Sequence, residues 1–147
     1  MFTSLAHDLV TSLENIYINR KKLSKINLRG EAAVLLYLLQ CQEEGLITPG
    51  KLSEALNIST ARVAASLNSL EKKALIVRVI NKKDRRQIII TLTNNGQKQA
   101  KELKELQIKH LSFLLKELGE KDAFEVIRIA KRIEKIFEKT KKESKEE

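Results

Sequence analysis

Seven residues, Asn81–Gln87, group the side chains best suited to chemistry: the run Asn-Lys-Lys-Asp-Arg-Arg-Gln holds four cations and one carboxylate. The run lies between Ile76–Ile80 and Ile88–Leu92, two apolar stretches whose β-branched residues favour strands of a half-buried sheet. We therefore expect a β-hairpin with a basic tip. Such a tip can neutralise phosphate groups, and an arginine on it can enter a narrow minor groove of DNA.

Asp84 stands out in this tip, because a carboxylate weakens binding to phosphate unless it has another role. It lies two residues before Arg86, and a carboxylate can hold a guanidinium group in a bidentate pair. We therefore predict that Asp84 organises the tip and does not contact DNA itself. Lys82, Lys83 and Arg85 would mainly neutralise phosphate. Arg86 would probe the shape of the minor groove. The alternative is a loop of ordinary solvated charges.

A helix–turn–helix pattern precedes the hairpin. Thr48-Pro49 is typical of a helix start, with threonine as N-cap and proline at the first helical position. We expect a short helix here, followed by a turn at residues 57–59. Ser59 or Thr60 can then cap a second helix.

The second helix has one apolar and one polar side. If the apolar side faces the core, the spacing of about 100° per residue turns the polar side outward. Such a helix fits the major groove, where arginine pairs with guanine and asparagine with adenine. An amphipathic helix with a solvated face is the alternative. The predicted DNA contacts are Ser59, Thr60, Arg62, Asn68, Ser69 and Lys72, and the predicted inward residues are Val63, Leu67 and Leu70.

The positive charge is concentrated on this segment. The net charge of the chain is +9, and residues 51–100 hold ten Lys/Arg against three Asp/Glu. Residues 1–50 hold five of each kind, and residues 101–147 hold thirteen against eleven. A charge that served only solubility would have no reason to concentrate here, whereas a surface that binds a polyanion would. Double-stranded DNA is therefore the predicted partner.

Apolar residues at three- and four-residue spacing predict further helices on both sides of this unit. The expected fold is mainly α with a small β-hairpin wing, a winged helix-turn-helix with six helices. We expect one domain over residues 1–147, with a DNA-binding lobe at about 28–97 and a frayed charged tail at 140–147. The helices at about 2–24 and 98–139 have more apolar surface than the lobe can cover, which favours a homodimer through these terminal helices. The expected helices span about residues 2–24, 31–44, 49–56, 60–73, 94–118 and 121–139.

The sequence lacks the patterns of several other protein classes. Its one cysteine, Cys41, excludes an intramolecular disulfide, and we expect it to be a buried apolar residue rather than a redox sensor. Neither a signal peptide nor a membrane-spanning apolar run is found, so a cytoplasmic protein without a membrane partner is expected. Nucleophile motifs, glycine-rich phosphate loops and metal-ligand spacings are also missing, so we predict no enzyme activity, no metal and no cofactor.

Several short motifs together resemble the MarR family (multiple-antibiotic-resistance regulators). Asp84-Arg85-Arg86, followed by Leu92-Thr93 and Gly96, is similar to the wing signature of that family. Residues 51–59 resemble its helix–turn–helix entry, and residues 70–78 resemble its passage into the wing. The resemblance implies a homodimer with two winged-helix lobes. It also implies repression of transcription from a pseudo-palindromic operator, commonly relieved by a small-molecule effector.

The resemblance further implies roles for individual residues. An arginine at the Arg86 position would enter the minor groove while the aspartate at the Asp84 position holds it. An effector pocket would lie near the first, second and fifth helices. Tyr17, Tyr37 and His110 are the candidate pocket residues, and each of them also fits simple packing.

Two departures from the family pattern matter. Ala74 stands where glycine is usual, so either the turn after the second helix differs or the helix continues through Ala74. Ala65 and Ser69 are small where many members carry larger polar or basic side chains, so base recognition would depend on few residues. Two other functions therefore stay open: a non-specific architectural DNA-binding protein, and a winged-helix module that binds other proteins.

Overall fold

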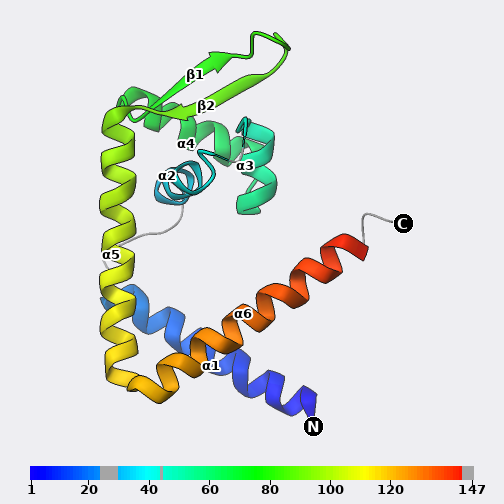
Figure 1. The fold of residues 1–147 in the computed structure, drawn as a ribbon, viewed down its shortest axis with the longest axis vertical. Coiled ribbons are helices and arrows are strands. Elements are labelled where there is room, and N and C mark those ends of the chain that lie inside the picture. Colours follow the sequence, from blue (N-terminus) through cyan, green and yellow to red (C-terminus); the bar gives the residue numbers. More distant parts are fainter. Residues whose placement is uncertain (24–29, 44, 144–147) are drawn as a thin grey trace. The chain divides into compact units, whose positions relative to one another are not determined.

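The computed structural model describes residues 1–23, 30–43 and 45–143, with the side chains of these residues except 17–23 and 141–143. Six helices and one antiparallel hairpin lie in the described residues, in the predicted order (Figure 1). The chain divides into two compact units, Met1–Lys101 and Glu102–Glu147. The elements are α1 (Phe2–Leu23), α2 (Glu31–Gln40), α3 (Pro49–Leu56), α4 (Thr60–Lys72), β1 (Ile76–Ile80), β2 (Ile88–Leu92), α5 (Asn94–Leu118) and α6 (Glu120–Glu143).

Residues 30–101 form a winged-helix lobe in which α2, α3 and α4 pack on one another and the hairpin closes the core (Figure 1). Val63, Leu67 and Leu70 of α4 are each 1% exposed or less, which confirms their predicted inward orientation. Burial of one stripe of each helix provides the main stabilisation of such a unit. The other fully buried large side chains are Val34 and Leu38 of α2, Leu52 of α3, Ile76 of β1 and Ile90 of β2.

The helix–turn–helix has the caps that its sequence predicts. Thr48 Oγ1 accepts a backbone N–H of the first turn of α3 at 3.3 Å, and Pro49 is the first residue of that helix. α3 ends at Leu56, and its C-cap residue Asn57 has a φ of 49°, in the left-handed region that asparagine tolerates better than most residues. Ser59 Oγ accepts the N–H of Arg62 at 3.3 Å and caps α4. These bonds set where each helix begins.

Ala74 adopts the conformation that glycine usually provides after a helix. Its φ is 54°, in the left-handed region that residues with a Cβ enter only at a cost. The N–H of Ala74 donates to Glu71 O at 2.9 Å, and that of Leu75 donates to Leu70 O at 3.0 Å, which is the Schellman pattern of a helix end. α4 therefore ends at Lys72, and the expectation that the helix continues through Ala74 is wrong.

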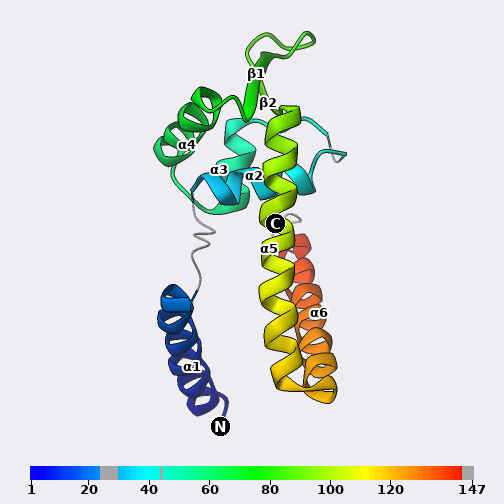
Figure 2. The same ribbon diagram turned by 90° about the vertical axis from the view of Figure 1, so that its left-hand side faces the viewer.

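The two strands of the hairpin are antiparallel, and Ile76 pairs with Leu92 at the end of the hairpin farthest from its loop. On the other edge of β2, the Ile90 N–H donates to Ile47 O at 2.8 Å, which ties the segment before α3 to the sheet. The loop of the hairpin extends beyond the helices of the lobe (Figure 2). The fold thus presents the tip where a large partner can reach it.

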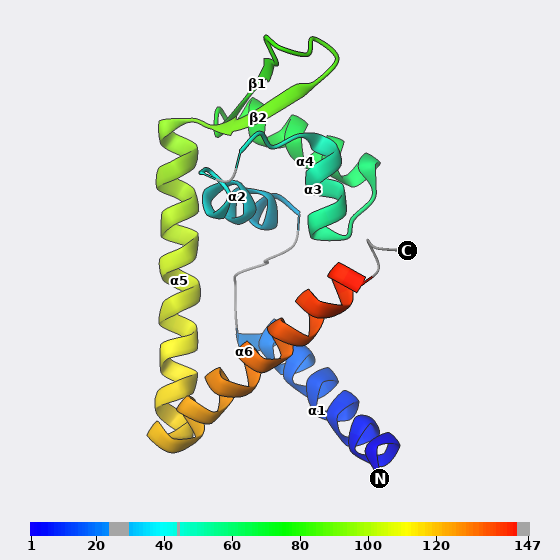
Figure 3. The same ribbon diagram turned by 45° about the vertical axis from the view of Figure 1, so that its right-hand side comes forward.

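Thr93 and Gly96 of the wing signature place the start of α5 against the turn that follows α4. The Thr93 N–H donates to Leu75 O at 3.0 Å, and its hydroxyl donates to Ala74 O at 2.7 Å. The hydroxyl oxygen also accepts the Gly96 N–H at 3.0 Å, as an N-cap does. A Cβ on Gly96 would stand 1.8 Å from Leu75 O, so this close approach requires glycine. β2 consequently leads directly into α5 (Figure 3).

The terminal helices expose apolar side chains along their length. α5 and α6 join at Gly119, whose φ is 84°, and diverge from it (Figures 1 and 3). α6 continues to Glu143, four residues beyond the predicted end of that helix, and residues 144–147 lie outside the described ones. Lysine and glutamate are good helix formers, and no glycine or proline interrupts them here. Exposed apolar residues include Phe2, Leu5, Leu9 and Leu13 of α1, Leu106, Leu111 and Leu114 of α5, and Phe124, Ile127, Ile133 and Phe137 of α6.

Three further observations concern Cys41, membrane-spanning helices and metal-binding side chains. Cys41 is 6% exposed at the end of α2, as its predicted burial requires. None of the described helices is both long enough and apolar enough to cross a bilayer. Within the described ranges, no three His, Cys, Asp or Glu side chains gather into a set that could hold a metal ion.

Candidate nucleic-acid interface

One side of α4 is exposed to solvent, and this side carries few long side chains. Ala61, Ala64 and Ala65 are all exposed on it, beside the polar groups that the sequence singled out. At its amino end, the free backbone N–H groups of the first turn favour an anion such as phosphate. Of the six predicted contacts, those that lie exposed on or next to α4 are Ser59, Thr60, Arg62, Asn68 and Lys72.

Ser69, the sixth predicted contact, faces the scaffold instead. Lys73 Nζ lies 2.6 Å from Glu31 Oε2, which joins the end of α4 to the start of α2. The hydrogen bond from Lys73, and then one from Ser69, lower the pKa of the Glu31 carboxyl below its usual value. Ser69 is half-buried in this contact. Ser69 was predicted as a DNA contact from helical spacing alone, and that spacing does not reveal that α2 packs against this side of α4.

A second polar contact that the sequence did not reveal joins β1 to α4. Arg78 Nη2 donates to Asn68 Oδ1 at 2.5 Å, and Arg78 Nε lies 3.5 Å from Glu71 Oε2. The Arg78 side chain is only 27% exposed. No short-range sequence signal marks this pairing, because it depends on how the hairpin folds back over α4.

Asp84 organises the tip through the main chain rather than through the Arg86 guanidinium. Its Oδ1 accepts the backbone N–H of Arg86 at 3.0 Å, and its carbonyl oxygen accepts the N–H of Gln87 at 3.0 Å. The structure has no ion pair between Asp84 and Arg86, both of which are described, so the predicted bidentate pair is wrong. An aspartate in a turn readily bonds the N–H two residues on, which competes with a longer-range side-chain pair.

Asn81 and Gln87 close the base of the tip, a role that the sequence did not reveal. Asn81 is 8% exposed, and its Nδ2 donates to Gln87 Oε1 at 3.1 Å. Its Oδ1 accepts the Lys83 N–H at 3.0 Å, and its own N–H donates to Gln87 O at 2.9 Å. The tip therefore has a hydrogen-bonded frame. Its four cations, Lys82, Lys83, Arg85 and Arg86, are exposed, and none is in an ion pair with a described acid.

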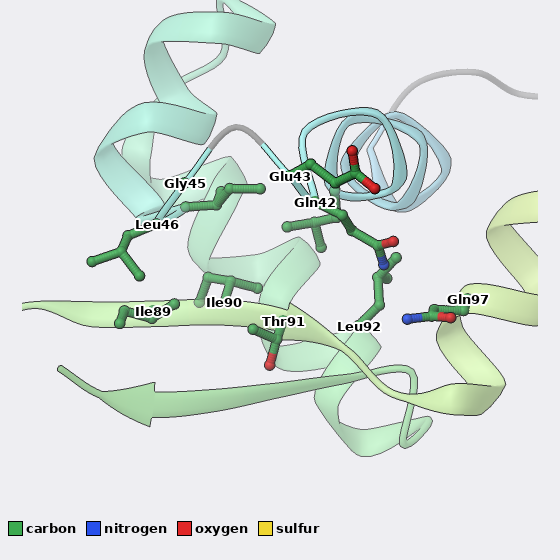
Figure 4. Close-up of a pocket in the computed structure, with 11 residues that line it drawn as sticks. Gln42, Glu43, Gly45, Leu46, Ile89, Ile90, Thr91, Leu92 and Gln97 are labelled. Atoms are coloured by element: carbon green, nitrogen blue, oxygen red, sulfur yellow. The ribbon is translucent and has the colours of Figure 1, made fainter. Parts of the chain in front are cut away.

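The lobe also has an open groove beside β2, with a volume of about 480 Å³ (Figure 4). Gln42 and Gln97 lie on its rim, from the end of α2 and the start of α5. None of the predicted pocket residues lines it: Tyr37 is half-buried elsewhere on α2, and the Tyr17 side chain lies outside the described ones. His110 is exposed, and its Nδ1 bonds Leu106 O at 2.9 Å within α5. The lining residues are Leu38, Gln42, Glu43, Gly45, Leu46, Ile47, Ile89, Ile90, Thr91, Leu92 and Gln97.

Comparison with known proteins places this fold in a family. Residues 16–106 match the family model described as transcriptional regulator SarA/Rot. The chain belongs to the SarA/Rot family of transcriptional regulators. This membership confirms the prediction of a MarR-like winged-helix regulator of transcription.

Relatives of this SarA/Rot protein are named for regulation. The HTH-type transcriptional repressor MdtR of Bacillus subtilis is 28% identical over 120 residues, which cover 77% of either chain. MepR, a transcription regulator of the Staphylococcus aureus multidrug efflux pump MepA, has a TM-score of 0.62 at 20% identity, over 95% of this chain and 98% of MepR. A crystal structure of the S. aureus MepR–DNA complex has a TM-score of 0.60 at 21% identity, with the same coverage. These structures share the fold.

Proposed function

We propose that this protein is a homodimeric cytoplasmic repressor that binds a pseudo-palindromic operator, with α4 in the major groove and the tip in the adjacent minor groove. The observation that carries the proposal is the tip, where Asn81 and Asp84 hold the backbone and none of the cations pairs with an acid among the described residues. A loop of ordinary solvated charges would need no such frame. The relatives add support, since MdtR is named as a repressor and MepR is described in complex with DNA.

The homodimer is proposed from the apolar surface of the terminal helices. Phe2, Phe113 and Phe124 are each at least 67% exposed, and soluble monomers rarely leave apolar surface of this extent uncovered. A second copy of the chain would cover these helices, at about residues 2–24 and 98–139, by twofold symmetry. Two copies of α4 would then lie about 34–36 Å apart, one turn of DNA, and each lobe would bind half of the operator.

Individual side chains would divide the work of binding. Lys82, Lys83 and Arg85 neutralise phosphate, which gives affinity without sequence preference. Arg86 enters the minor groove, whose width depends on sequence. The residues of α4 that reach bases or phosphates are Ser59, Thr60, Arg62, Asn68 and Lys72.

A small molecule that releases the protein from DNA is also part of the proposal. The groove beside β2 has an apolar floor and the polar groups of Gln42, Glu43 and Gln97 on its rim. It suits an apolar molecule with one hydrogen-bonding or cationic group. Because β2 lines the groove and follows directly after the tip, a bound molecule would shift the hairpin. Candidate molecules can be titrated into the preformed protein–DNA complex, and the groove variant Leu46→Trp should abolish any release.

Two variants test the proposal on operator and on random DNA. Arg86→Ala should weaken binding to the operator far more than binding to random DNA, because it removes the reader of groove shape. Lys82→Ala should weaken both equally and make the salt dependence less steep by about 0.9 in the logarithmic slope. Equal losses for Arg86→Ala on both DNAs would contradict the assigned role of Arg86.

One observation favours a second candidate function, non-specific architectural DNA binding. The exposed side of α4 carries Ala61, Ala64 and Ala65, which offer few groups for reading base edges. Specific binders typically favour their sites about 10³–10⁷-fold over other DNA. A ratio near unity between the best and random sites would identify the architectural function.

A further inference from the structure

Arg78 connects the wing hairpin to the exposed side of α4. Its guanidinium bonds Asn68 Oδ1 at 2.5 Å and approaches Glu71 Oε2 at 3.5 Å. Arg78 stands opposite the buried Ile90 in the sheet, and its Nε is fully buried. The guanidinium therefore joins β1 to α4 through a partly buried polar contact and is not a free surface charge.

This contact fixes the orientation of the Asn68 amide. A guanidinium carries only donors, so the amide atom that faces Arg78 has to be the oxygen. Asn68 is exposed, and no described residue accepts a hydrogen bond from its Nδ2. The nitrogen, with its two donors, is thus the atom left for a further partner.

The fixed orientation changes which base Asn68 can recognise. Adenine recognition uses both amide atoms, the oxygen accepting from N6 and the nitrogen donating to N7. With its oxygen held by Arg78, Asn68 offers donors, and guanine presents two neighbouring acceptors, N7 and O6, in the major groove. We infer that Arg78 is a positioning residue that makes Asn68 select guanine over adenine. The inference rests on the proposed placement of α4 in the major groove.

A binding selection on randomised duplex DNA with the full-length protein tests the inference. Asn68→Ala identifies the base pair that Asn68 reads, because that position alone loses its preference. The unaltered protein should favour guanine over adenine there by about tenfold, the effect of one good base contact. Arg78→Met frees the amide oxygen, so adenine should rise at least to parity with guanine at this position, with the other positions unchanged.

Two more variants keep the test independent of the stability of Arg78→Met. Glu71→Gln is the matched control, since it removes the ion pair with Arg78 and leaves the bond to Asn68. It should keep the guanine preference. Asn68→Asp retains a partner for Arg78 but has no donor, so it should lose the guanine preference without a lower melting temperature.

The outcomes separate this inference from the proposed function. Adenine at the Asn68 position in the unaltered protein would overturn the inference and leave the operator-binding proposal intact. An unchanged preference in Arg78→Met or in Asn68→Asp would do the same. Binding without any enriched motif, or no DNA binding by the unaltered protein, would overturn both.

Discussion

The hairpin tip and α4 differ in how much of their polar chemistry the fold already uses. In the tip, Asn81 and Asp84 bond backbone and side-chain groups of the loop, and none of the four cations is in an ion pair with an acid that the structure describes. On α4, Asn68 is held by Arg78, and Ser69 faces the scaffold. We therefore propose that affinity for DNA comes mainly from the tip, while base discrimination comes from a few oriented groups on α4.

Removing the tip cations should have the largest effect on DNA binding. The variant with glutamine at positions 82, 83, 85 and 86 should lose most affinity. Its logarithmic salt slope should become less steep by about 2.7, at about 0.9 for each of the phosphate contacts assigned to Lys82, Lys83 and Arg85. Fluorescence anisotropy across about 50–200 mM salt measures the slope. The matched control replaces four lysines of α6 by glutamine, Lys121, Lys131, Lys135 and Lys139. Equal changes of slope in both variants would remove the distinction between tip and general charge.

Loss of the tip frame should have the next largest effect. Asn81→Ala leaves the Lys83 N–H and Gln87 Oε1 without their partner, which should cost about 1–2 kcal/mol of unfolding free energy. DNA binding should fall as well, because the loop no longer holds its cations in place. Urea unfolding and operator titration measure the two effects.

Asp84→Asn is the control for the frame, because an amide oxygen can still accept the Arg86 N–H. It should preserve stability and operator binding. A loss as large as that of Asp84→Ala would instead indicate that the charge of Asp84 acts on Arg86 directly.

Ala74→Gly should stabilise the end of α4 by about 1 kcal/mol, because glycine adopts the left-handed conformation without the steric cost of a Cβ. Ala74 lies in the turn after α4 and is not a proposed DNA contact, so the base preference of the protein should not change. Ala65→Gly, in the middle of α4, is the paired control and should destabilise by about 1 kcal/mol. Thermal unfolding of both variants measures these changes, and an Ala74→Gly variant that is no more stable than the unaltered protein would contradict the strain at Ala74.

The smallest expected effect concerns the Glu31–Lys73 pair. The folded state lowers the pKa of Glu31, so the stabilisation is present above the unfolded value of 4.5 and is lost as the pH falls through the lower folded value. Both side chains are at least one third exposed, so solvent screening limits the effect to less than about 1 kcal/mol. Glu31→Gln should be less stable than the unaltered protein at about pH 7, and the difference should disappear once the pH lies below the folded pKa of Glu31. A gap that persists at low pH would exclude the carboxylate as its cause.

Local signals were sufficient to predict most of the lobe. The caps at Thr48 and Ser59, the inward stripe of α4 and the two β-branched strands each depend on residues within a few positions of one another. The close approach of Gly96 to Leu75 explains in physical terms why the wing signature ends in glycine.

Contacts between elements were not predictable in the same way. The Arg78–Asn68 bond joins residues ten apart across a helix–strand turn, and the Lys73–Glu31 bond joins residues forty-two apart. Both need the packed lobe to form. The Asp84 prediction failed for the opposite reason, since a bond to a nearby N–H replaced the expected side-chain pair. Helical spacing likewise predicted which side of α4 carries Ser69, but it could not reveal that α2 packs against that side.

The most direct measurement of the central claim is a salt-dependent binding selection on randomised duplex DNA with the purified protein. The account predicts enrichment of one inverted repeat whose half-sites lie about one helical turn apart, with affinity that falls steeply as salt rises. Salt-sensitive binding without any enriched motif would contradict sequence recognition by α4 and favour an architectural role. No binding even at low salt would contradict the DNA interface altogether and favour a winged-helix module that binds other proteins.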